Sequence, residues 1–283
     1  MKTVSILMPC YNDGAYIKEA IASAQAQTWP SIEIIVVDDG STDPETRKIL
    51  AELKQQKRCT VLTQANQGPG AARNRAFQHA KGDYILPLDA DDRIAPTYIE
   101  KALNELEAHP DAGVCYCHAE LMGEGSGPWK LPDFSLGEML IDNVIFVTAL
   151  IRREAYAQVG GFDESLVRGI EDYDFFLSIL EHHWQVRQLP ETLFSYRIKS
   201  ISRSRQLSED DSLRAQLYQQ IFDKHRDFFI AHLDQMLPAV RQRSFLYQAN
   251  CMETQYLRHA IRDKSPKGFA RLFLMRYFGK FSR

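Results

Sequence analysis

The sequence lacks the features that mark several common classes of protein. No apolar run approaches the ~20 residues that a membrane-spanning helix needs, and no C-x-x-C pair among the five cysteines suggests a zinc site. Basic residues are not in excess, since 34 Lys and Arg stand against 37 Asp and Glu. The formal net charge of −3 therefore argues against a general nucleic-acid-binding protein, which usually needs a strongly basic surface.

The residues that are present are typical of a soluble globular enzyme. The 283 residues suffice for one large domain, or for one domain with an appendage. Apolar residues make up 45% and charged residues 25% of the chain, which are ordinary values. The cysteines are scattered and odd in number, which fits a reducing compartment. Because the first residues also run straight into a strand pattern without a signal peptide, we expect a cytoplasmic protein.

Strand and helix signals alternate along the first half of the chain. Short apolar runs bounded by turn residues predict strands at 4–8, 32–37, 60–63, 84–88 and 112–117. Helical patterns lie between them, at 15–26, from a start at 41–45, and at 71–80 and 96–109. This rhythm predicts an α/β fold with a parallel sheet and helices on both faces. From about residue 206 the pattern is helical, so we place one domain at 1–205 and a helical C-terminal segment at 206–283.

Three polar turns follow strands of this predicted sheet. They are Pro9–Asn12, where the first strand is expected to stop at the proline, then Asp38–Gly40, and Asp89–Asp91. Ligands of parallel α/β sheets bind at the carboxyl ends of the strands. We therefore expect the three turns to meet in one crevice.

The third turn carries carboxylates at Asp89, Asp91 and Asp92. Like charges packed at a strand end repel one another, and a cation would remove that cost. Hard oxygen ligands suit Mg²⁺ or Mn²⁺, and Mg²⁺ usually takes one or two protein carboxylates and completes its shell with water and substrate phosphates. The alternative is a helix start, where acids before Pro96 would favour the helix dipole. Beside the other two turns, the metal site is the favoured interpretation.

Three further positions have both a chemical and an ordinary interpretation. Asp39 ends the second strand, where it can accept hydrogen bonds from a ribose or a base edge, or simply belong to a turn and helix cap. The run Gly68–Asn74 lacks the third glycine of G-x-G-x-x-G and the Gly-Lys-Ser/Thr end of a Walker A loop, so its Arg73 faces either a nucleotide or solvent. Glu171 and Asp172 precede an apolar helix, as acids at helix starts commonly do, although one of them could be a general base.

Taken in order, these motifs resemble family 2 glycosyltransferases, which carry a GT-A fold: a Rossmann-like nucleotide-binding mixed sheet with helices on both faces. The resemblance covers roughly residues 3 to 205. It rests on Met8-Pro9-Cys10-Tyr11-Asn12, Val36-Val37-Asp38-Asp39-Gly40-Ser41-Thr42-Asp43, the D-x-D motif Asp89-Ala90-Asp91, and Gly160-Gly161-Phe162-Asp163-Glu164 followed by Glu171-Asp172. Each piece is weak by itself, and the ordered set is specific.

The resemblance implies a role for each matching residue. Pro9, Tyr11 and Asp39 would frame the nucleotide base and ribose, and Arg73 would assist from its helix. Asp89 would contact the ribose and the metal, and Asp91 would bind Mg²⁺ or Mn²⁺ directly. Asp172 would be the catalytic base, with Glu171 beside it to orient donor or acceptor.

One position departs from the family's pattern. Members often show a histidine after the Tyr-Arg of a late loop, whereas this chain has Lys199 after Tyr196-Arg197-Ile198. A lysine can neutralise phosphate as a point charge, but it cannot serve as a neutral metal ligand. The alternative is a solvated basic loop that includes Arg203 and Arg205.

The function that the resemblance implies is metal-dependent, inverting transfer of a hexosyl or N-acetylhexosaminyl group. The donor would be a nucleotide-diphosphate sugar, with a UDP-sugar favoured, and the acceptor a glycan or a lipid-linked hydroxyl in cell-envelope or exopolysaccharide assembly. The alternatives are a catalytically silent module that binds nucleotide sugars or glycans, and a sugar-phosphate nucleotidyltransferase. The latter should show a glycine-rich loop with a basic residue after the first strand, which Pro9–Asn12 does not provide.

The end of the chain raises a question of location. Phe269, Phe273, Tyr277 and Phe281 recur every four residues and would share one face of a helix, and no acid follows Asp263. A basic helix with an aromatic stripe can lie in an anionic membrane surface, or it can pack on the catalytic domain or on a second copy. Peripheral contact of residues 264–283 with the inner face of the plasma membrane is thus one of two predictions for this segment.

Overall fold

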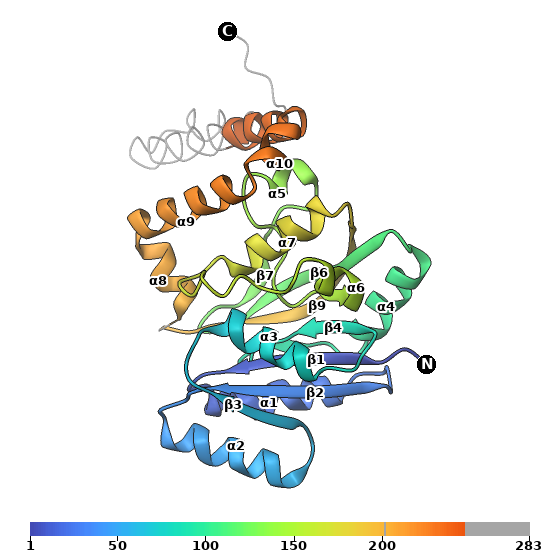
Figure 1. Ribbon diagram of the computed structural model, residues 1–283, viewed down its shortest axis with the longest axis vertical. Coiled ribbons are helices and arrows are strands. Elements are labelled where there is room, and N and C mark those ends of the chain that lie inside the picture. Colours follow the sequence, from blue (N-terminus) through green and yellow to red (C-terminus); the bar gives the residue numbers. More distant parts are fainter. Residues whose placement is uncertain (201, 247–283) are drawn as a thin grey trace, which may run out of the picture.

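The structure, a computed structural model, describes residues 1–200 and 202–246. Its centre is a mixed sheet in the order β3-β2-β1-β4-β8-β6-β9-β5, with β7 paired to β6 (Figure 1). The strands are β1 (Val4–Cys10), β2 (Ile32–Asp39), β3 (Thr60–Gln64), β4 (Tyr84–Pro87), β5 (Arg93–Ile94), β6 (Ala112–Gly123), β7 (Gly127–Trp129), β8 (Leu150–Arg152) and β9 (Gln185–Ile198). The helices that precede the last strand are α1 (Gly14–Gln25), α2 (Pro44–Gln56), α3 (Pro69–His79), α4 (Tyr98–Ala108), α5 (Leu136–Met139), α6 (Arg153–Gln158) and α7 (Glu171–Glu181).

The first half is the parallel sheet that the sequence predicts. β1 pairs with β2 on one side and with β4 on the other, and β2 pairs with β3, all in parallel. Every residue of β1 is buried, because helices cover both faces of such a sheet and its strands then read as continuous apolar runs. The prediction that the first strand stops at Pro9 is wrong, since β1 continues to Cys10.

The strand tolerates this proline because of where β4 ends. The carbonyl of Leu7 accepts a hydrogen bond from the N–H of Leu88 on the β4 side, and alternate residues of a strand face the same neighbour. Pro9 therefore faces β4 as well, but β4 ends at Pro87, opposite Leu7. The missing N–H of Pro9 costs no hydrogen bond of the ladder.

The second half of the sheet is mixed, and its longest strand, β9, was not predicted from the sequence. β8 lies antiparallel between β4 and β6, while β9 runs parallel to β6 and antiparallel to β5. The pairing of β6 with β9 has three irregularities, and one of them skips from Cys117↔Leu189 to His118↔Thr192, which leaves Pro190 and Glu191 without a partner in the register. A proline and alternating polar residues hide the strand character of β9, and a bulge accommodates the residue that cannot donate.

Two sets of helices cover the sheet. Helix α1 contacts α2 and β1, and Gln27, two residues beyond its end, accepts a hydrogen bond from the N–H of Ile99 in α4. Helix α3 contacts β1 and β2, and Phe77 in α3 stacks on Tyr156 of α6, which in turn contacts α7. The core lies between these layers. Because β1, β2 and β4 are parallel, their carboxyl ends lie at one edge of the sheet.

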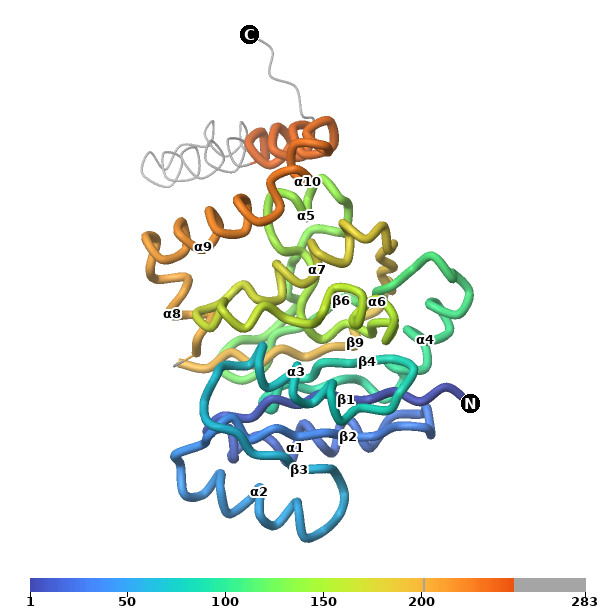
Figure 2. Tube along the Cα trace, in the orientation of Figure 1, coloured from blue at the N-terminus to red at the C-terminus, as the bar shows by residue number. Residues whose placement is uncertain are grey.

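The described chain is helical from Arg203 onward. The helices are α8 (Arg203–Glu209), α9 (Asp211–Lys224) and α10 (Arg226–Ala231), followed by helical residues at 233–246. Figure 2 traces α9 from α8, near the edge of the sheet, to α10 at the opposite end from α2. Leu217, Ile221 and Phe229 are buried in the same core as the sheet. The helical segment thus packs on the α/β fold, and a domain boundary at 205/206 stays a prediction.

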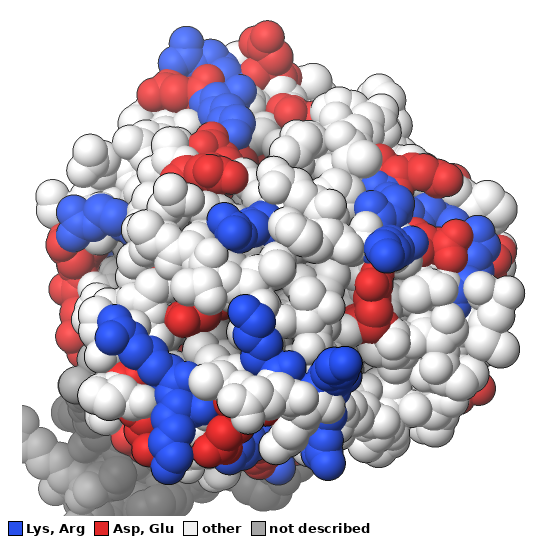
Figure 3. Space-filling view, turned by 60° about the horizontal axis from the view of Figure 1, so that its bottom comes forward, with Lys and Arg blue, Asp and Glu red and all other residues white. Residues whose placement is uncertain are grey.

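Surface and length give two further observations. On the face in Figure 3, the described Lys and Arg side chains are interspersed with Asp and Glu. Among residues 1–200 and 202–246, no helix combines the length and the apolar character that crossing a membrane requires. The predicted aromatic stripe and the whole of 264–283 lie outside the described residues.

Candidate functional site

A cleft of about 660 Å³ opens at the carboxyl ends of β1, β2 and β4. The three polar turns predicted to converge do line it, together with the segment that follows β9. Of the predicted site residues, the cleft is lined by Pro9, Tyr11, Asp39, Asp89, Asp91 and Lys199. Arg73, Glu171 and Asp172 are not among the lining residues. Ion pairs connect Arg73 and Glu171 to the wall, whereas Asp172 accepts a hydrogen bond of 2.9 Å from the N–H of Tyr173.

Arg73 joins the D-x-D turn to α7. Its side chain is 1% exposed, its Nη2 lies 2.6 Å from Oδ1 of Asp89, and its Nη1 lies 3.0 Å from Oε1 of Glu171. The interpretation that Arg73 faces solvent is therefore wrong, and Arg73 is bonded to Asp89 in the wall of the cleft. Arg203 at the cleft wall also reaches Oε1 of Glu171, at 2.6 Å, so two arginines share one buried carboxylate.

Asp91 is held by a lysine instead. The Lys199 ammonium lies 2.7 Å from Oδ2 of Asp91 and 2.6 Å from Oδ1 of Asp13. Burial raises the pKa of Asp91 even though Lys199 acts to lower it, because Asp89 and Asp13 add negative charge nearby. The pKa of Lys199 is raised in turn, since the two carboxylates outweigh the cost of its burial. The basic loop of the sequence analysis is thus part of the cleft.

The third acid of the turn has a structural role. Asp92 is 1% exposed and accepts a hydrogen bond of 2.8 Å from the N–H of Arg197 near the end of β9. Arg197 returns a bond of 2.7 Å from its Nε to the carbonyl of Asp91. Burial and the neighbouring charges of Asp91 and Asp89 raise the pKa of Asp92. These bonds tie β9, and with it Lys199, to the D-x-D turn.

Both carboxylate oxygens of Asp39 accept hydrogen bonds from other residues of the protein. Asp39 accepts bonds of 2.8 to 2.9 Å from the side chain of Gln64 and from the N–H groups of Gln67 and Gly68. Gly68 has φ +91°, a conformation that other residues rarely adopt. Asp39 thus fixes the entry to α3 while it lines the cleft beside Pro9 and the half-exposed ring of Tyr11.

Glu171 and Asp172 begin α7, and their pKa values are shifted in opposite directions. Burial would raise the pKa of Glu171, but Arg203 and Arg73 outweigh it and hold that pKa below its usual range. Burial raises the pKa of Asp172 to about 6, and the charge of Glu171 adds to the shift while Arg73 and Arg203 oppose it. Neighbouring groups whose pKa values are pushed apart are a pattern of acid–base sites. Asp172 is the member of the pair that titrates near neutral pH.

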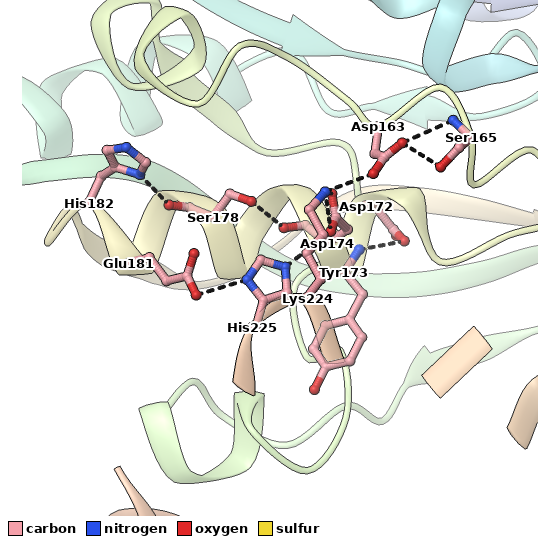
Figure 4. Close-up of polar contacts among 10 residues, drawn as sticks. All are labelled: Asp163, Ser165, Asp172, Tyr173, Asp174, Ser178, Glu181, His182, Lys224 and His225. Carbon is pink, nitrogen blue, oxygen red and sulfur yellow. Dashed lines mark hydrogen bonds and ion pairs between the residues drawn. The ribbon is translucent and has the colours of Figure 1, made fainter. Parts of the chain in front are cut away.

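The other side of α7 is anchored by the C-terminal helices, as Figure 4 shows. Asp174 is 2% exposed and lies 2.8 Å from the Lys224 ammonium and 3.0 Å from Nε2 of His225. Lys224 also binds Asp163 at 2.8 Å, and Nδ1 of His225 lies 2.9 Å from Glu181. Burial lowers the pKa of His225, but Asp174 and Glu181 outweigh it and raise the pKa overall.

Asp13, Lys224 and His225 were not predicted as site residues, and Arg203 was named only in the alternative of a solvated basic loop. Nothing local identifies Lys224 or His225, since their partners lie some fifty residues away on α7. A signal did exist for Asp13, which directly follows the first polar turn.

A divalent cation fits the residues at the D-x-D turn. Within the described residues, no group of three or more His, Cys, Asp and Glu side chains could hold a metal ion. Asp89 and Asp91 offer two carboxylates in one wall of the cleft, which is the protein share that Mg²⁺ commonly takes in phosphate sites. The remaining ligands would then come from water and from the phosphates of a substrate.

The mixed sheet, with its acidic turn and ligand cleft at the carboxyl ends of the strands, defines a GT-A glycosyltransferase fold. The sequence profile described as Glycosyl transferase family 2 matches residues 5–160. The chain therefore belongs to glycosyl transferase family 2, and both the predicted family and the predicted GT-A fold are confirmed.

Individual relatives agree with this assignment. The chain is 30% identical over 182 residues to a chondroitin synthase of Escherichia coli, and this alignment covers 63% of this chain and 26% of that protein. It spans 17% to 62% of the length of eight curated relatives that it matches.

Two solved structures share the fold. Staphylococcus aureus TarS, in a complex with UDP, aligns with a TM-score of 0.57 at 19% identity, over 99% of this chain and 93% of that chain. The mannosyltransferase PcManGT of Pyrobaculum calidifontis, in complex with GDP-Man and Mn²⁺, gives a TM-score of 0.62 at 17% identity, over 98% and 84%.

Proposed function

We propose that this chain is a metal-dependent, inverting glycosyltransferase that moves a sugar from a nucleotide-diphosphate sugar to an acceptor hydroxyl. One observation carries the proposal: the D-x-D turn at Asp89 and the acidic pair at Glu171 are bound to the same buried guanidinium, behind one cleft. This bridge would set the separation between the proposed donor site and Asp172, the candidate base next to Glu171. Family membership and the GT-A fold support the reaction class.

Charge around the cleft supports the need for a metal. The carboxylates of Asp13, Asp89, Asp91 and Glu171 face three cations, Arg73, Lys199 and Arg203, so the described set is negative by one before a donor arrives. A diphosphate adds about two negative charges, and like charges 4 Å apart repel by about 4 kcal/mol at an effective dielectric constant near 20. Mn²⁺ or Mg²⁺ held by Asp89 and Asp91 would offset this repulsion and act as a Lewis acid toward the leaving diphosphate.

The residues of the chain would divide the remaining work. Pro9, Tyr11 and Asp39 would frame the base and ribose, and Lys199 would lie beside the diphosphate. Asp172, with a pKa raised to about 6, is ionised at neutral pH and still basic enough to take a proton from an acceptor hydroxyl. That oxygen would attack the anomeric carbon from the side opposite the leaving group. A single displacement inverts the carbon, so an α-linked donor would give a β-linked product.

The donor and the acceptor are proposed at the level of class. UDP-sugars are favoured, because TarS with this fold is solved with UDP, although PcManGT is solved with GDP-Man. A glycan or lipid-linked acceptor in polysaccharide assembly is in keeping with a chondroitin synthase among the relatives. We keep a cytoplasmic location, with peripheral membrane contact through 264–283, as a proposal. Exposed apolar side chains at Ile230, Leu233 and Leu237 lie on the helices that lead toward that segment.

The experiment that tests this function is a donor-consumption assay. Purified protein is incubated with UDP-, GDP- or TDP-sugars, a mixed panel of glycan acceptors, and Mn²⁺ or EDTA, and the released nucleoside diphosphate is quantified. We expect release with one class of base, lost in EDTA and lost in Asp172→Asn. Nucleotide-sugar binding without release under any condition would favour a silent binding module instead.

A further inference from the structure

The Arg73 guanidinium connects three separate segments of the site. It contacts Asp89 in the turn after β4 at 2.6 Å and Glu171 at the start of α7 at 3.0 Å, and it lies 5.2 Å above the ring of Phe162. Phe162 belongs to the Gly-Gly-Phe-Asp loop that precedes α7. No other described residue is bonded to both carboxylates.

This bridge is not arranged for stability alone. Arg73 is among the largest fully buried side chains of the protein, and burying an ion pair often costs more in desolvation than its attraction returns. Nε of Arg73 and Oε2 of Glu171 are buried without any hydrogen-bond partner. An incompletely bonded buried pair calls for an explanation beyond packing. Its two ion pairs join Asp89, in the proposed donor site, to Glu171, the neighbour of the proposed base.

We infer that Arg73 is a positioning residue, which sets the distance between the D-x-D turn and α7 and so keeps the catalytic base at the right distance from the donor. This inference rests on the proposed function and goes beyond nucleotide contact as the role of Arg73. Asp172 is the neighbour of the bridged Glu171 on α7, so a shift of the bridge moves the base relative to the donor. Displacements of about 1 Å can cost 10²-fold in rate.

The same bridge has an electrostatic effect on the base. Burial and Glu171 raise the pKa of Asp172, and Arg73 is the first of the groups that oppose this rise. Removing the guanidinium charge therefore raises the pKa of Asp172 further. Because the base must be ionised to accept a proton, the acidic limb of the rate profile moves to higher pH. A residue that only supports the fold would leave this limb in place.

The test compares Arg73→Lys and Arg73→Met with the wild type in the donor-consumption assay. Lysine keeps the charge but cannot span two carboxylates as a planar fork does. We expect Arg73→Lys to lose on the order of tenfold to a hundredfold in kcat, with the acidic limb near its wild-type position. In Arg73→Met the limb should also move up by roughly one pH unit or more.

A matched control separates positioning from folding. Arg152 is also mostly buried, and it bonds to the hydroxyl of Tyr84 and the carbonyl of Ala112, away from the cleft. Arg152→Lys should lower Tm without moving the limb or selectively lowering kcat. If Arg73→Met does not fold, Arg73→Lys against Arg152→Lys still decides the question.

The outcomes distinguish the two proposals. Wild-type protein that consumes no donor overturns the proposed function, and the positioning role falls with it. Active wild type together with an Arg73→Lys variant of unchanged kcat overturns the positioning role alone. A loss of kcat in Arg73→Lys that Arg152→Lys matches at equal loss of Tm also overturns it.

Discussion

The ammonium of Lys199 lies 2.7 Å from Oδ2 of Asp91, the carboxylate that we propose as a direct metal ligand. The lysine and a divalent cation therefore compete for the same oxygen. We predict that Lys199→Met binds Mn²⁺ several-fold more tightly in the absence of donor, because the competing cation is gone. Donor affinity at saturating Mn²⁺ should fall, since a positive charge beside the diphosphate is lost. Calorimetric titration of Mn²⁺ measures the first effect, and weaker Mn²⁺ binding by the variant would refute the competition.

Asp91 and its neighbour Asp92 should differ in their effect on the metal dependence of donor binding. Asp91→Ala should weaken donor binding mainly in the presence of Mn²⁺, because it removes a ligand that we assign to the metal. Asp92→Asn is the matched control, since its side-chain oxygen can still accept from the N–H of Arg197. It should keep the metal dependence of donor binding. Equal loss of donor affinity in Asp91→Ala with and without Mn²⁺ would count against Asp91 as a ligand.

Asp172→Asn should abolish transfer and leave donor binding nearly intact. The substitution keeps shape and removes the group that accepts the proton, which typically costs 10²- to 10⁴-fold in rate. Donor dissociation constants and kcat, measured on the same preparation, separate the two effects. Near-normal turnover in this variant would exclude Asp172 as the base.

The raised pKa of Asp172 fixes a pH dependence. The carboxyl must be ionised to act as a base, and burial raises its pKa to about 6, so kcat should decline with falling pH through that value and level off about one pH unit above it. The measurement is a pH profile of kcat at saturating donor, metal and acceptor. A profile that stays flat down to pH 5 would contradict the assignment.

The anchor on the far side of α7 should make stability depend on pH in the opposite sense. His225 has a folded-state pKa above its ordinary value because Asp174 and Glu181 favour its charged form. Its contribution is fully present below the unfolded pKa near 6.5 and is lost as pH rises through the folded value. The Tm of the wild type should therefore fall above that range, relative to the Tm of His225→Gln measured over the same pH values. Parallel curves for the two proteins would show that the histidine does not carry this linkage.

A strand could be predicted from the sequence where the rest of the fold buries both of its faces. β1, β2 and β4 are largely buried, so their apolar runs identify them without knowledge of the fold. In the edge strand β3 only Val61 is buried, and its signal is correspondingly short. β9 is half covered and contains Pro190, so its pattern resembles a loop, and its pairing with β6 depends on long-range contacts. Periodicity cannot supply contacts of that kind.

The candidate site divides in the same way. Residues at strand ends, such as Asp89 and Asp91, were placed in the cleft because topology alone brings those ends together. The partners of these residues could not be predicted, since Arg73 and Lys199 meet them only through side-chain packing across the fold. Local patterns left Arg73 facing either a nucleotide or solvent, and the structure bonds it to two carboxylates instead.

The most direct test of the central claim is a thermal-shift panel of UDP-, GDP- and TDP-sugars, each with Mn²⁺ and with EDTA. A ligand that binds only the native state raises Tm by mass action. The account predicts a shift with one class of base that disappears in EDTA and in Asp91→Ala. A donor shift of equal size in EDTA would contradict a metal held by Asp89 and Asp91, and no shift with any donor would contradict a preformed nucleotide-sugar site in this cleft.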